Sequence, residues 1–151
     1  MREPTIFWHA DIRPGMVRDI GSTLDLFSTL CHLAGVQVPD DRVMDSVDLS
    51  PTLFHGKPGG RQVFFFYRGS ELYAARKGPY KLHLITEDAY QRDNKKTAHD
   101  PPLLFNVHED PGEQFNISSD HPEIVRDILR EIELHRSNLI PGEDQLVKRL
   151  S

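Results

Sequence analysis

The hydrophobic pattern of this chain changes its period at the stretch GKPGG, residues 56–60. Before it, apolar residues recur at the three- and four-residue spacing of a helix. After it, they fall in short runs rich in aromatic and β-branched residues, which favour strands. Clusters of Gly and Pro mark loops between structural units. We therefore expect two parts, residues 1–58 and 59–151, with different architectures.

The most regular helical pattern of the first part is STLDLFSTLCHLAG. Ser22 or Asp25 can cap its amino end, and Gly35 supplies the left-handed residue that ends it. Its apolar residues share one face, which predicts an amphipathic helix that buries this face. They are Leu26, Phe27, Leu30, Leu33 and Ala34.

The sequence of residues 1–58 predicts too few helices and strands to enclose a hydrophobic core. The sequence TIFW, Thr5–Trp8, predicts a short buried strand that stops at the turn residues Arg13-Pro14-Gly15. After the helix, only a single helical turn is expected, at SPTLF, with Pro51 in its first turn. One strand and one helix cannot close a core, so such a unit packs on a larger sheet. The first part therefore looks like a fragment of a larger α/β domain.

The second part predicts a small antiparallel sheet covered by one long helix. Strands are expected at Gln62–Arg68, on either side of a turn at Lys77-Gly78-Pro79, and at Leu103–Val107. In the last strand, residues 103, 105 and 107 would lie on one side. The polar stretch Thr86–Ala98 predicts a loop, and Asp120 would cap the long helix that follows. The core stripe of this helix is expected at Ile124, Val125, Ile128, Leu129 and Ile132.

Charge and cysteine content exclude several classes of function. The formal net charge is −5, and the basic residues are scattered, which argues against a nucleic-acid surface. No apolar run approaches the roughly 20 residues needed to span a bilayer. The single cysteine, Cys31, rules out an internal disulfide framework, and we expect it to be a small buried residue.

The stretch HDPPLLFNVHEDPGEQFN, residues 99–116, concentrates histidines and carboxylates. His99-Asp100 and His108-Glu109 are neighbours in sequence, so on a strand their side chains point to opposite faces. We therefore expect no metal site here. Instead, EDPGE predicts a turn in which Asp110 accepts backbone hydrogen bonds and Gly112 adopts a positive φ. His99 lies at the exit of a polar loop and stays a candidate functional residue.

Other chemical motifs are weak or missing. No serine lies in the Gly-x-Ser-x-Gly setting of a hydrolase, and no glycine-rich phosphate loop occurs. His32 follows Cys31 directly, and neighbours on a helix diverge too far to act as a nucleophile–base pair. Asn116-Ile117-Ser118 is an N-glycosylation acceptor if the protein enters the secretory pathway.

Five blocks in order resemble the carboxy-terminal part of the type I sulfatases, most closely the arylsulfatase A and N-acetylgalactosamine-6-sulfatase branch. The blocks cover nearly the whole chain. They read REPTIFW…IRPG, STLDLFSTLCHLAGV, DRVMDSVDLSPTL, FFFYRGSELYAARKGPYKLH and HDPPLLFNVHEDPGEQFNI. The resemblance implies an α/β, alkaline-phosphatase-like fold, of which residues 1–58 form the carboxy-terminal edge of the catalytic domain. Residues 59–151 would form the α+β carboxy-terminal subdomain.

The resemblance also implies where the chemistry lies. Sulfatases hydrolyse sulfate esters with a formylglycine made from a Cys/Ser-x-Pro-x-Arg motif and with a calcium ion that neutralises the sulfate. Here Cys31 is followed by His-Leu-Ala, and no calcium-ligand pair matches the family motif. We therefore expect no catalytic residue, metal or cofactor in this chain. An amino-terminal sulfatase domain would be its partner and carry formylglycine and calcium, so the isolated chain would be inactive.

Within the resemblance, three residues are candidates for the rim of the substrate pocket. His99 would direct a hydrogen bond or positive charge toward a sulfated small molecule or glycan. Tyr67 and Arg68 are further rim candidates, with packing at a strand end as the alternative. Two alternatives stay open: a non-catalytic binding or scaffolding module derived from a sulfatase, and an unrelated histidine-rich metal binder. Family kinship implies a secretory, lysosomal, periplasmic or exported location.

Overall fold

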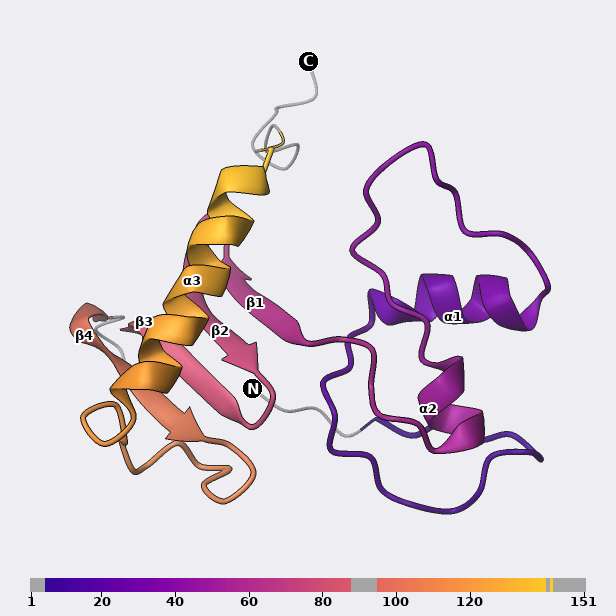
Figure 1. Cartoon of the computed structure of the whole chain (residues 1–151), viewed down its shortest axis with the longest axis horizontal. Helices are drawn as coiled ribbons and strands as arrows, with labels where there is room; N and C mark the ends of the chain where they lie inside the picture. Colours follow the sequence, from indigo (N-terminus) through magenta and orange to yellow (C-terminus); the bar gives the residue numbers. More distant parts are fainter. Residues whose placement is uncertain (1–4, 88–94, 141, 143–151) are drawn as a thin grey trace.

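The structure is a computed structural model that describes residues 5–87, 95–140 and 142. Figure 1 shows two parts side by side: two short helices with long connecting segments, and a four-stranded sheet with one long helix lying across it. The elements in chain order are α1 (Asp25–Leu33), α2 (Ser50–His55), β1 (Val63–Arg68), β2 (Glu71–Lys77), β3 (Tyr80–Glu87), β4 (Lys96–Asn106) and α3 (Pro122–Asn138).

The sheet is a simple antiparallel meander in the order β1-β2-β3-β4. Gly69 and Gly78 make its first two turns possible, because both adopt a positive φ (59° and 56°) that other residues rarely take. The turn expected at residues 77–79 is therefore confirmed. Together with the helix that follows, this sheet confirms the predicted carboxy-terminal subdomain.

Helix α3 packs on one face of the sheet and closes the main core (Figure 1). Ile128 and Ile132 are fully buried against Leu82 and Leu104, which pair directly across β3 and β4. The predicted stripe of this helix is confirmed. The predicted cap is wrong: His121 occupies the cap position, and its side chain makes no capping hydrogen bond.

Strand β4 is longer than predicted. It begins at Lys96 rather than Leu103 and includes Asp100-Pro101, a cis peptide, followed by Pro102. Prolines are tolerated because β4 is an edge strand, where backbone donors need no partner. The loop expected at Thr86–Ala98 is correspondingly shorter, since β3 runs to Glu87. Residues 88–94 lie outside the described residues.

Both sides of β4 carry buried residues. Leu104 points to α3 and is fully buried, whereas Phe105 packs edge-on against His83 with 5.7 Å between ring centroids. Phe105 is nevertheless only 6% exposed. Apolar residues are buried on both sides of this strand, so their alternation does not show which side carries the helix.

The strand predicted at Thr5–Trp8 is not formed. Ile6 is 90% exposed and Trp8 is 88% exposed, and the single sheet of the described residues contains only the four strands above. A strand needs a neighbouring strand for its backbone hydrogen bonds, and no described strand pairs with this stretch.

Helix α1 forms where predicted and is followed by Gly35 with a positive φ (67°), but the face that it buries is the reverse of the expectation. Its buried side chains are Asp25, Ser28 and Thr29. Its apolar residues are exposed instead: Leu26 at 38%, Phe27 at 46%, Leu30 at 61% and Leu33 at 52%. We call these four residues the α1 apolar face.

A buried ion pair holds the polar side of α1 in place. The Asp25 carboxylate is completely buried and accepts hydrogen bonds from the Arg61 guanidinium and from the backbone N–H groups of Ser22 and Val47. Asp25 therefore does not act as the predicted cap, because its side chain reaches away from the first turn of the helix. Arg61 ties the connection before β1 to α1.

No helix in the described part of the chain is both long and apolar enough to cross a membrane.

Candidate functional site

Tyr67 and Arg68 lie at the end of β1 and both line a shallow hollow of about 320 Å³ on the sheet. The Tyr67 hydroxyl lies 2.8 Å from Nε2 of His135 on α3. The Arg68 guanidinium pairs with Glu87 at 2.8 Å, and its side chain stays 52% exposed. Arg68 can therefore still offer N–H donors to a ligand, whereas the Tyr67 hydroxyl already has a protein partner.

His99 lies in β4 and is partly buried. Its Nε2 is 2.8 Å from the hydroxyl of Thr86 on β3, which itself lines the hollow. Thr86 is next to Glu87, the partner of Arg68. The structure thus places Arg68 and His99 at the same end of the sheet, linked through two neighbouring residues of β3, although His99 does not line the hollow directly.

A network of charges and hydrogen bonds surrounds these residues. The Tyr73 hydroxyl donates to Glu87 at 2.7 Å, and this hydrogen bond raises the pKa of Tyr73. Lys96 pairs with Glu71 at 2.5 Å, which raises the pKa of Lys96. The network can recognise polar or charged groups through hydrogen bonds, but it lacks the nucleophile and base pair that bond cleavage needs.

A second cluster, which the sequence did not reveal, lies on the sheet face away from α3. Glu113 bridges Lys81 and His83, at 2.6 Å from each. Burial raises the pKa of Glu113, but hydrogen bonds from His83 and Lys81 outweigh it and lower that pKa to about 2. Two features of the sequence could have indicated this cluster. Lys81 and His83 flank Leu82 and therefore share one face of the strand, and Glu113 belongs to the turn at residues 109–113.

The turn at residues 109–113 is partly as predicted. Asp110 accepts hydrogen bonds from the backbone N–H groups of Gln114 and Phe115, at 2.6 and 2.9 Å. The residue with positive φ is Glu113 (55°), not Gly112. Glu113 adopts this unfavourable conformation because its carboxylate is held by two partners on the sheet.

A metal ion and the formylglycine motif each require a particular group of residues. Among residues 5–87, 95–140 and 142, no three His, Cys, Asp or Glu side chains are grouped as metal ligands. Cys31 is partly buried on α1 and lacks the Pro and Arg of the modification motif.

Comparison with known families shows where this architecture occurs. A family model described as the C-terminal region of aryl-sulfatase matches residues 59–150, which include the whole sheet and α3. The chain belongs to the sulfatase family. The resemblance of the sequence blocks to arylsulfatase A and N-acetylgalactosamine-6-sulfatase is thereby confirmed.

Individual sulfatases extend the similarity into the first part of the chain. Bovine (Bos taurus) arylsulfatase A is 38% identical over 87% of this chain and 29% of its own length. Mouse (Mus musculus) N-acetylgalactosamine-6-sulfatase is 36% identical over 97% of this chain and 32% of its own length. The chain thus spans about a third of these relatives.

A solved structure agrees with the fold of this sulfatase region. It comes from work on the metabolism of multiple glycosaminoglycans by Bacteroides thetaiotaomicron, and it carries the label 6S-sulf. It superimposes with a TM-score of 0.66 and 25% identity, over 85% of this chain and 28% of that one. The α/β sulfatase fold predicted from the sequence is therefore confirmed.

Proposed function

We propose that this chain is the carboxy-terminal part of an enzyme that hydrolyses aryl or sugar sulfate esters, and that it helps to wall the substrate cleft. Membership of the sulfatase family supports the reaction class. The identities of 38% and 36% to an arylsulfatase and to an N-acetylgalactosamine-6-sulfatase support the two substrate types.

The α1 apolar face is the observation that carries this proposal. Four large apolar side chains on one helix are between 38% and 61% exposed, while the polar side of the same helix is buried. A soluble domain does not normally present such a stripe to water, so it marks a contact surface. The matched relatives are about three times longer than this chain, and their amino-terminal portion is the natural occupant.

The catalytic groups belong to that amino-terminal portion in this proposal. It would carry the formylglycine and the calcium ion, which polarise and attack the sulfate ester. The present chain supplies side chains at the rim, and by itself it releases no sulfate.

The decisive assay measures sulfate release from a chromogenic aryl sulfate ester. The purified 151-residue chain should show no activity, and the complete polypeptide should be active. Loss of that activity on replacing the Cys or Ser of an upstream Cys/Ser-x-Pro-x-Arg motif would identify the nucleophile. A complete polypeptide that lacks this motif and binds sulfated glycans without turnover would support a non-catalytic binding module instead.

We assign His99 a role at the cleft rim. Its Nε2 is held by Thr86, which fixes the ring and leaves Nδ1 without a partner among the described residues. The free ring nitrogen can donate or accept a hydrogen bond to a ligand. In the complete enzyme, His99→Ala should raise KM or lower kcat with an unchanged Tm. His55→Ala removes an exposed histidine of α2 and serves as the control. Unchanged kinetics for His99→Ala would refute the role.

We also propose a cellular location for this protein. A sulfatase of this kind would pass through the secretory pathway to a lysosome or be exported from a bacterial cytoplasm. Asn116 is exposed and belongs to an Asn-x-Ser acceptor, so in a eukaryotic secretory pathway it would carry a glycan.

A further inference from the structure

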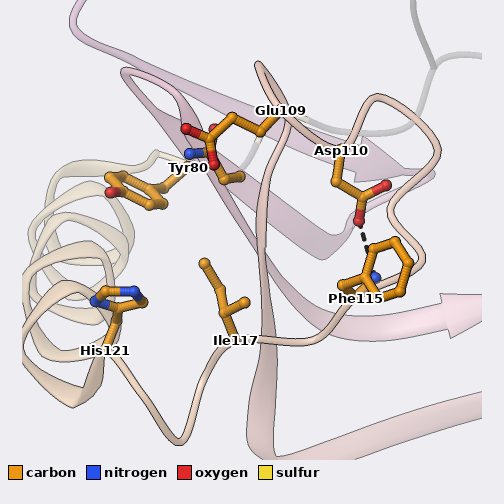
Figure 2. Close-up of a pocket in the computed structure, with 7 residues that line it drawn as sticks. Tyr80, Glu109, Asp110, Phe115, Ile117 and His121 are labelled. Atoms are coloured by element: carbon orange, nitrogen blue, oxygen red, sulfur yellow. Dashed lines mark hydrogen bonds between the residues drawn. The ribbon is translucent and has the colours of Figure 1, made fainter.

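We propose that a second pocket, at the opposite end of the sheet, binds the guanidinium group of an arginine presented by another protein. The pocket has a volume of about 370 Å³ and lies between the start of β3, the end of β4 and the start of α3. Figure 2 shows residues that line it: Tyr80, Glu109, Ile117 and His121 lie on one side of the view, and Asp110 and Phe115 on the other.

Three rings and one aliphatic side chain form the apolar part of this pocket. The Tyr80 and His121 rings lie 6.3 Å apart and are tilted by 47°. Ile117 separates them from Phe115, whose side chain is 70% exposed (Figure 2). A large aromatic side chain left this open provides a stacking surface that the chain itself does not use.

Two carboxylates complete the lining (Figure 2). Glu109 is exposed, and no described residue makes a hydrogen bond or ion pair with its carboxylate. Asp110 uses Oδ2 for the backbone N–H groups of Gln114 and Phe115, which leaves Oδ1 for a ligand. The only basic side chain in the lining is His121, which lies 3.4 Å from Glu123 outside the pocket. The pocket is therefore negatively charged and complements a cation.

The combination of rings and carboxylates selects a guanidinium. This group is planar, stacks on aromatic faces and donates two parallel hydrogen bonds to one carboxylate. A sulfate or phosphate would be repelled by Glu109 and Asp110. A divalent metal ion is disfavoured because the described residues offer no three-donor group here.

The position of the pocket indicates a partner chain as the source of the arginine. Strand β1 is the sheet edge nearest α1 and α2, whereas β4 is the edge farthest from them (Figure 1). The pocket shares no lining residue with the α1 apolar face, so the two are separate surfaces. The proposal does not depend on sulfatase activity.

The test is a titration of the isotopically labelled 151-residue chain by ¹H–¹⁵N NMR with N-acetyl-arginine amide. The expected result is a saturable shift of the backbone signals of Phe115, Ile117 and His121. N-acetyl-citrulline amide, which has the same shape without the charge, should bind at least about threefold more weakly.

Two variants localise the binding. Glu109→Gln and Phe115→Ala each change an exposed side chain, so both should fold, and each should weaken binding by about two- to fivefold. Glu133→Gln removes an exposed carboxylate elsewhere, on α3, and should leave binding unchanged. Equal binding of the arginine and citrulline compounds, or a Glu109→Gln variant that binds like the parent, would overturn the proposal.

Discussion

At the scale of single residues, the Asp25–Arg61 pair is the main support of the first part. Asp25 is fully buried and the Arg61 side chain is 11% exposed, so removing either partner leaves an uncompensated charge in a dry place. Asp25→Ala should therefore lower the free energy of unfolding by about 3–5 kcal/mol. Urea denaturation at pH 7, followed by circular dichroism, measures this loss.

The matched control is Asp41→Ala, which removes an exposed carboxylate that pairs with its neighbour Arg42. Because water screens this pair, its loss should leave the urea midpoint almost unchanged. Equal midpoints for the Asp25 and Asp41 variants would show that the buried pair does not hold α1.

The lowered pKa of Glu113 should make the folding stability of the chain depend on pH. Its folded pKa of about 2 lies below the ordinary value of 4.5, so the folded state holds the proton more weakly than the unfolded chain. The resulting stabilisation, up to about 3 kcal/mol, is complete above pH 4.5 and disappears as the pH falls toward 2. Urea midpoints between pH 7 and pH 2 should fall for the parent chain. Glu113→Gln should be less stable at pH 7 and show a flatter acid limb.

Asn116 should be structural as well as a glycan acceptor. Its Oδ1 accepts hydrogen bonds from the backbone N–H groups of Leu104 and Ser118, at 3.0 and 3.1 Å. Asn116→Gln should therefore cost about 1 kcal/mol of stability, since the longer side chain misplaces the acceptor. Ser118→Ala abolishes the glycosylation motif but keeps both backbone contacts, so its thermal midpoint should match that of the parent. Equal destabilisation by both changes would contradict this reading.

At the scale of elements, changing a polar residue of α1 should reduce stability more than changing one of its large apolar residues. This is the reverse of the usual order for a helix. Leu30 is 61% exposed, so Leu30→Lys should leave the stability of the isolated chain nearly unchanged and reduce binding of a hydrophobic dye. Thr29 is buried: its hydroxyl donates to the Asp25 carbonyl at 2.6 Å and accepts from Leu49 N–H at 2.9 Å. Thr29→Val should cost about 1–3 kcal/mol. A larger loss for Leu30→Lys, by urea denaturation, would be inconsistent with the observed orientation.

Local sequence patterns were sufficient to predict the elements whose packing partners lie within the described part of the chain. The hairpin turn at Gly78 and the stripe around Ile128 were predictable because turn chemistry and helical periodicity are local properties. The strand at Thr5–Trp8 and the buried side of α1 were mispredicted, because both depend on a neighbour that the described residues do not include. An apolar pattern shows that a face will be covered, but not by which element.

The candidate site was predictable only in part. The sequence indicated Arg68 and His99 as candidate site residues, and the structure places both at one end of the sheet. It did not reveal the Glu113 bridge or the contact between Tyr67 and His135, because both join positions far apart in sequence. Their roles in substrate binding stay a prediction, as does the domain boundary after residue 58.

At the scale of the whole molecule, the two parts differ in how they are held together. The second part has a closed core in which Leu82, Leu104, Ile128 and Ile132 are fully buried. The first part relies on the Asp25–Arg61 pair and a few hydrogen bonds, and it leaves the α1 apolar face open. A small sheet-and-helix unit can be stable alone, whereas an open helix gains most of its stability from a partner.

Hydrogen–deuterium exchange at α1 tests this account most directly. Backbone amides of residues 26–33 are compared between the purified 151-residue chain and the complete polypeptide, with the amides of α3 as an internal reference. We expect α1 to exchange quickly in the isolated chain and to become strongly protected in the complete polypeptide, while α3 is protected in both. Equal protection of α1 in the two samples would contradict the claim that its apolar face packs against the amino-terminal portion of a sulfatase.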